Sequence, residues 1–211
     1  MIYVDKTEEA AKYLGYKARS DLTQIKPMIK SCFLELERIS SKKTTYKIFP
    51  KIDNSLKVTK EDKIELPGKI IHSHLKGSNK VVLMGATLGL EVDKRIKYYQ
   101  YKDLAKSFIL DACASALIEE VCNDLEKEIK SNLEMSVKMT SRFSPGYGDL
   151  PLNFQEKISR ILNLEKNIGV TINENNILIP RKSVTALIGI GIDKKISHCK
   201  YCNLNCDNKD G

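Results

Sequence analysis

Apolar residues recur at spacings of three and four in several long segments, which is the period of an amphipathic helix. This pattern predicts helices over 5–14, 21–40, 69–75, 91–101, 102–131 and 154–162. Alternating or β-branched segments predict strands over 44–49, 56–58, 80–83, 135–139, 168–172, 177–179 and 183–192. Pro50 is expected to end the first strand, and 85–89 to turn into the helix at 91. Because strands and helices mix without regular βαβ alternation, we predict an α+β fold with a twisted, mainly antiparallel sheet and packed helices.

One stretch departs from secondary-structure periodicity and has the residue types of a site, Arg142-Phe143-Ser144-Pro145-Gly146-Tyr147-Gly148-Asp149. Its glycines can adopt positive φ and let a ligand approach the main chain, while the proline keeps the turn stiff. Arg142 can hold a carboxylate through two parallel hydrogen bonds, and Tyr147 can stack on a ligand. By chemistry alone, a binding loop and an ordinary surface turn remain alternatives.

The pattern Arg-x-x-Pro-Gly-Tyr at 142–147 resembles the S-adenosylmethionine-binding motif of the activation domain of cobalamin-dependent methionine synthase. The resemblance spans roughly 80–195, and its specific part is 142–186. Further matching segments are 85–89, 155–158, 164–170, 173–175, 179–180 and 182–186. The chain departs from the family where Gly148-Asp149 replaces the usual Pro-Ala after the tyrosine.

The resemblance implies a C-shaped α+β domain that binds S-adenosylmethionine and supports reductive methylation, or reactivation, of cobalamin. Arg142 would hold the methionine carboxylate and Glu119 the ammonium group, with Asp149 as an alternative ammonium partner. The loop would contribute the remaining contacts, from Pro145, Gly146, Tyr147 and Gly148. No catalytic residue is expected, because the cobalt of the cobalamin supplies the nucleophile.

The same resemblance predicts partners rather than an independent enzyme. No folate, homocysteine or cobalamin module is recognisable in the 211 residues, so we expect an accessory subunit acting in trans. Its partners would be a cobalamin-binding methionine synthase (a methyltransferase of methionine biosynthesis) or another corrinoid protein, and an electron donor such as flavodoxin.

Length and charge refine this interpretation. We expect a single domain over 1–195 and a Cys-rich tail over 196–211. The net charge is 35 − 27 = +8, but the basic and acidic residues interleave, which favours solvated faces over nucleic-acid binding. A basic patch for an acidic protein partner is equally compatible. Acids at positions 5, 8 and 9 argue against a signal peptide, and the longest apolar run, 81–90, is too short to span a membrane. We therefore expect a cytoplasmic protein.

The tail supplies a second candidate site, in which Cys199, Cys202 and Cys206 follow His198. This density of thiols suits zinc or an iron–sulfur cluster, and equally a flexible tail without metal. A metal- or cluster-binding electron-transfer adaptor for a corrinoid protein is therefore the alternative function, and a purely structural interaction module is a third. His72 and His74 lie two residues apart without a third ligand nearby, so we interpret them as non-catalytic.

Overall fold

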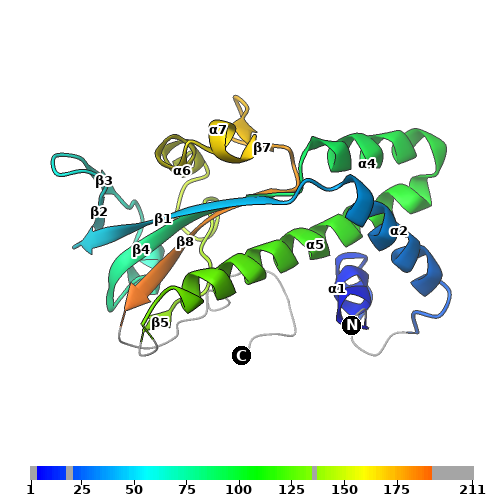
Figure 1. Ribbon diagram of the computed structural model, residues 1–211, viewed down its shortest axis with the longest axis horizontal. Coiled ribbons are helices and arrows are strands. Elements are labelled where there is room, and N and C mark those ends of the chain that lie inside the picture. Colours follow the sequence, from blue (N-terminus) through cyan, green and yellow to red (C-terminus); the bar gives the residue numbers. More distant parts are fainter. Residues whose placement is uncertain (1–3, 18–20, 135–136, 192–211) are drawn as a thin grey trace.

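The computed structural model describes residues 4–17, 21–134 and 137–191. Its centre is a six-stranded sheet in the order β3-β2-β1-β4-β8-β5, and every neighbouring pair is antiparallel (Figure 1). The strands of this sheet are β1 (Lys43–Ile52), β2 (Ser55–Lys57), β3 (Lys63–Glu65), β4 (Ser78–Thr87), β5 (Lys138–Met139) and β8 (Ser183–Gly191). A separate hairpin pairs β6 (Thr171–Ile172) with β7 (Leu178–Ile179).

Helices cover both faces of this sheet. One face carries α1 (Val4–Tyr13), α2 (Lys26–Ile39), α4 (Leu90–Lys102) and the long α5 (Leu104–Ser131). The other face carries α3 (Lys69–His74), α6 (Phe154–Leu162) and α7 (Leu164–Ile168). In Figure 1, α5 runs along one side of the sheet, and α6 and α7 lie across the opposite side.

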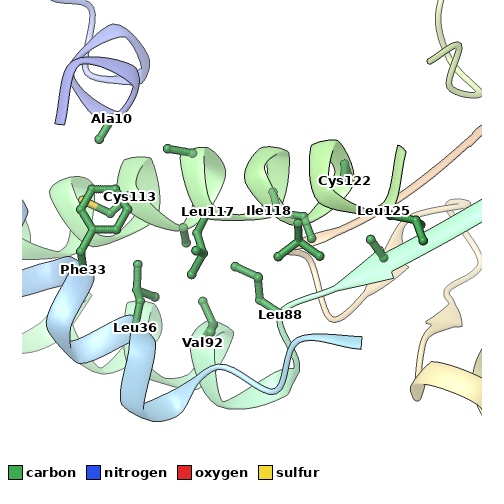
Figure 2. Close-up of a cluster of buried hydrophobic side chains, with 14 of the residues drawn as sticks. Ala10, Phe33, Leu36, Leu88, Val92, Cys113, Leu117, Ile118, Cys122 and Leu125 are labelled. Atoms are coloured by element: carbon green, nitrogen blue, oxygen red, sulfur yellow. The ribbon is translucent and has the colours of Figure 1, made fainter. Parts of the chain in front are cut away.

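Alternation along the central strands divides the apolar residues into two cores. On β4, Val82 and Met84 face the α5 side, whereas Val81 and Leu83 face the α6 side. β8 alternates in the same way, so both central strands are buried on both faces. Figure 2 shows part of the first core, where the α5 side chains Leu117 and Ile118 point toward Leu88 and Val92.

The structure confirms the predicted α+β class and the mainly antiparallel sheet. Two local expectations were wrong. β1 continues through Pro50, because pairing with β2 begins only at Lys51 and a proline at the edge of that ladder is tolerated. Residues 85–87 belong to β4 instead of a turn, because they pair with β1 on one side and β8 on the other. A Cβ on Gly85 would lie 2.7 Å from Leu164 Cδ2, so this glycine lets α7 pack closely on the strand.

Several element ends also differ from the sequence prediction. The helix expected from 21 begins at Lys26, with Pro27 in its first turn, where a missing N–H costs nothing. The strand expected over 168–172 is only Thr171–Ile172, because α7 extends to Ile168 and ends at left-handed Gly169, whose φ is 72°. Among the described residues, no helix combines the length and apolar character that crossing a bilayer demands.

Candidate functional site

A β-bulge aims the Arg142 side chain. Met139 pairs with Ile190, and Phe143 pairs with Leu187, which precedes Ile190 in the antiparallel strand β8. Four steps of chain thus lead from Met139 to Phe143, whereas only three lead from Ile190 to Leu187. The extra residue shifts the inward and outward alternation by one. As a result Phe143 joins the core on the α6 side, and the preceding Arg142 reaches toward α5.

Two buried polar side chains hold the bulge in place. The Thr140 hydroxyl accepts from Gly189 N–H at 2.9 Å and donates to the Ser141 carbonyl at 3.0 Å. The His74 ring, which is fully buried, donates from Nε2 to the same carbonyl at 2.8 Å. His74 therefore supports the Arg142 loop from behind, which is a structural role.

After Phe143 the chain makes two consecutive tight turns. Tyr147 N–H donates to Ser144 O at 3.2 Å, and Leu150 N–H donates to Tyr147 O at 3.1 Å. Gly146 has a φ of 91° and Gly148 a φ of 55°, which confirms the expectation that both glycines adopt the left-handed region. Pro145 is buried, whereas the Tyr147 side of the loop is open and that residue is 47% exposed.

Asp149 at the end of the loop binds the main chain of α3. Its carboxylate accepts from Lys69 N–H at 2.5 Å and from Ile70 N–H at 3.1 Å. This contact requires Gly68, where a Cβ would lie only 2.3 Å from Asp149 Oδ1. The acid that distinguishes this chain from the family pattern therefore ties the loop to a neighbouring helix.

Arg142 contacts one polar stripe of α5. Its Nη2 donates to Glu119 Oε2 at 2.6 Å, and its Nη1 donates to Asn123 Oδ1 at 2.9 Å and to Glu126. Positions 119, 123 and 126 share a face because they are separated by four and three residues. The guanidinium side chain is only 17% exposed, so these charge-assisted contacts are partly shielded from water.

Two further side chains lie near this cluster, the buried thiol of Cys122 and the phenol of Tyr13. Burial raises the pKa of the Cys122 thiol to about 12, and Arg142 opposes this shift while Glu119 adds to it. Partial burial raises the pKa of the half-exposed Tyr13 phenol on α1 to about 12, with the negative charges of Glu119 and Glu9 contributing. Since Tyr147 and Arg142 also act on Tyr13, this phenol lies beside the candidate site.

The structure brings together some of the sequence-predicted residues. Arg142 and Glu119 are in direct contact, and the loop from Pro145 to Gly148 follows immediately. Asp149 belongs to the same loop but is directed at α3. Sequence reasoning missed Asn123, Glu126 and Tyr13. Polar residues at 119, 123 and 126, spaced by four and three on one face of α5, were the available signal for the first two.

The remaining candidates do not join this site. Cys199, Cys202 and Cys206 lie outside the described residues, so the metal hypothesis for the tail stays a prediction. Within the described ranges, no group of three or more His, Cys, Asp or Glu side chains is arranged to hold a metal ion. His72 donates from Nε2 to the Leu66 carbonyl at 2.6 Å, which is a structural role.

A shallow hollow of about 440 Å³ is lined by α4, and a second of about 420 Å³ is lined by α2 and Arg95 of α4. None of the lining residues belongs to the Arg142 loop. The two hollows share Arg95, which pairs with Glu35. Lys106 also binds Glu35 at 3.0 Å and lies 4.1 Å from the ring centroid of Tyr99. These charges are satisfied by one another, so we interpret the network as a link between α2, α4 and α5.

Comparison with known proteins identifies the fold. No protein-family model matches the chain, and no curated protein matches its sequence significantly. Among solved structures, the crystal structure of the MetH reactivation domain bound to AdoHcy matches with a TM-score of 0.63 at 17% sequence identity. The match covers 88% of this chain and 70% of that chain. The chain therefore has the fold of a reactivation domain, which confirms at the level of fold the resemblance inferred from 142–186.

Proposed function

We propose that this protein binds S-adenosylmethionine at the Arg142 loop and supports the reductive reactivation of a cobalamin on a methionine synthase or another corrinoid protein. The observation that carries the proposal is the contact between Arg142 and Glu119 beside the Pro-Gly-Tyr turn. It occurs in a fold shared with a reactivation domain whose structure contains AdoHcy, a ligand with the same amino-acid moiety.

The side chains suit a zwitterionic amino acid. A guanidinium binds a carboxylate through two N–H groups, and a carboxylate binds an ammonium group, so Arg142 and Glu119 together match both charges. Gly146 and Gly148 are exposed and leave their main chain accessible, and the half-exposed Tyr147 offers an aromatic face. Because the Asp149 carboxylate accepts from the α3 main chain, we assign the ammonium to Glu119.

The role of the chain is to position the ligand. The methyl group comes from S-adenosylmethionine, the nucleophile from the corrinoid of the partner, and the electron from a donor such as flavodoxin. The residues described above bind and orient the methyl donor, and the proposed reaction needs no general base from this protein. Holding the amino-acid moiety at the Arg142 end would leave the rest of the ligand directed toward the partner.

The test is calorimetric titration of S-adenosylmethionine into wild type, Arg142→Ala and Arg160→Ala. Arg160 is an exposed arginine on α6 and serves as the matched control. Losing a charge-assisted bidentate contact should weaken binding by roughly ten- to a hundredfold in Arg142→Ala, with no change in the control. The proposal is wrong if wild type fails to bind at millimolar ligand, or if both variants bind like wild type.

A further inference from the structure

We propose that Glu126 is an affinity-determining residue of this site, because it holds Arg142 in the ligand-free protein and competes with a ligand carboxylate for the guanidinium. The inference rests on the proposed function and adds a residue to it that the family motif does not contain. It also defines the ligand class: an α-amino acid zwitterion whose carboxylate replaces Glu126 on the guanidinium.

The contacts show that both outer nitrogens of Arg142 are already engaged. Nη2 donates to Glu119, and Nη1 donates to Glu126 and Asn123. A ligand carboxylate that binds in parallel fashion needs two N–H groups from one edge of the guanidinium. Three of the five N–H groups of Arg142 make these contacts, so a carboxylate bound at the edge of Nη1 and Nη2 competes with the acids of α5. We place the ligand carboxylate at this edge, where an ion pair to α5 opens on binding.

Charge and position decide which acid is displaced. If the ligand ammonium binds Glu119, this acid exchanges one cation for another and keeps a partner. Glu126 gains no such substitute, since a zwitterion supplies only one ammonium group. The Glu126 side chain is 29% exposed, so its carboxylate can be hydrated when Arg142 leaves it. The exchange then keeps a partner for Arg142 and for Glu119, whose side chain is itself 38% exposed, and transfers only Glu126 to water.

This competition lowers the apparent affinity for the ligand. When only a fraction of the protein has a free guanidinium, the apparent dissociation constant rises in inverse proportion to that fraction. Replacing Glu126 by glutamine keeps the shape and a neutral hydrogen bond but removes the charge. We therefore expect Glu126→Gln to bind S-adenosylmethionine about three- to tenfold more tightly than wild type.

The experiment compares wild type, Glu126→Gln and Glu128→Gln by calorimetry. Glu128 lies on the same helix but is exposed, which makes it a control for the loss of one negative charge from α5. Each protein is titrated with S-adenosylmethionine and with its decarboxylated analogue, which retains the ammonium and sulfonium groups. The gain in Glu126→Gln should be confined to the ligand that carries a carboxylate. A purely structural effect of the substitution would change both ligands alike.

The outcomes separate this inference from the proposed function. Tight wild-type binding with unchanged affinity in Glu126→Gln overturns the inference alone, as does an equal gain for the decarboxylated analogue. Absence of binding in every variant overturns the proposed function and the inference together. A double-mutant cycle of Arg142→Ala and Glu126→Gln in urea unfolding gives a reading without ligand. If it shows no coupling between the two residues, Glu126 does not hold Arg142 and the inference fails.

Discussion

At the scale of single residues, the site depends on a close fit between Gly68 and Asp149. Gly68 has a φ of 104°, and a Cβ there would lie within 2.5 Å of the Asp149 carboxyl carbon. The glycine thus serves two purposes, a left-handed backbone and room for the carboxylate that binds α3. The loop that carries Arg142 is anchored at its far end by this contact.

We predict that Gly68→Ala lowers the free energy of unfolding by roughly 2–4 kcal/mol, the sum of left-handed strain and overpacking. Gly169→Ala is the matched control, because its φ is also positive, at 72°, but nothing lies within 4 Å of the added Cβ. The control should lose only about 1 kcal/mol from backbone strain. Urea unfolding measures both, and equal losses would show that the Asp149 contact is unimportant.

A second residue-scale prediction concerns the half-exposed Tyr13, whose pKa is raised to about 12 by partial burial and then by Glu119. The pKa of Tyr13 in the folded protein exceeds its unfolded value near 10, so the protonated phenol favours the folded state. This contribution of Tyr13 to the free energy of unfolding is complete below pH 10 and is lost as the pH rises toward 12. NMR of tyrosine labelled at Cζ, assigned with Tyr13→Phe, should show this late titration. Glu119→Gln should lower the pKa of Tyr13, whereas Glu128→Gln should leave it unchanged.

At the scale of elements, the bulge between β5 and the Phe143 bridge decides where Arg142 points. The Thr140 hydroxyl replaces a regular ladder bond by accepting from Gly189 N–H. Without this contact the segment can return to regular pairing, which would rotate Arg142 to the opposite face of the sheet.

We therefore predict that Thr140→Val lowers stability by about 1–3 kcal/mol, because Gly189 N–H is left unsatisfied in a buried position. The same variant should also bind S-adenosylmethionine more weakly. Thr140→Ser retains the hydroxyl and should preserve affinity while losing only a methyl group. Urea unfolding and calorimetry on the two variants check this, and normal binding by Thr140→Val would mean that the bulge does not position Arg142.

The elements also show how far sequence reasoning reached. Local signals predicted the long helix, the central strands and the glycine turns of the loop, because helix periodicity and turn residues are encoded within a few positions. The bulge could not be predicted, since it arises from pairing with β8, more than forty residues further along the chain. The turn expected at Gly85 was wrong for the same reason, because the role of this glycine is set by contact with Leu164 on α7.

The site shows the same division. Arg142 was predicted because a family motif contains it, and Glu119 because it corresponds to a family glutamate outside that motif. The loop glycines were predicted because their backbone requirement is local. Glu126 and Asn123 become visible only when the bulge turns Arg142 toward α5. Tyr13 enters from a helix that precedes the loop by more than a hundred residues, and nothing in its own neighbourhood in the sequence indicates this.

At the scale of the whole molecule, one sheet serves two cores. β4 and β8 each contribute side chains to both cores. If the packing on one face is lost, these two strands lose support, and the core on the other face is destabilised as well. The Arg142 loop depends on both faces, because Phe143 packs on the α6 side while Arg142 contacts α5. This sharing predicts that the described part of the chain unfolds as a single cooperative unit.

We predict that Leu117→Ala in the first core and Leu187→Ala in the second each cost about 2–5 kcal/mol, since both side chains are fully buried. NMR in increasing urea can follow each face separately. The Met84 methyl reports on the first core, and the His74 ring, 5.0 Å from Phe143, reports on the second. In both variants the two signals should be lost at one common midpoint, lower than that of wild type. If Leu187→Ala shifted only the His74 transition, the faces would unfold independently. The loop could then lose its α6-side support while α5 stayed folded, and ligand binding would be lost before the first core melts.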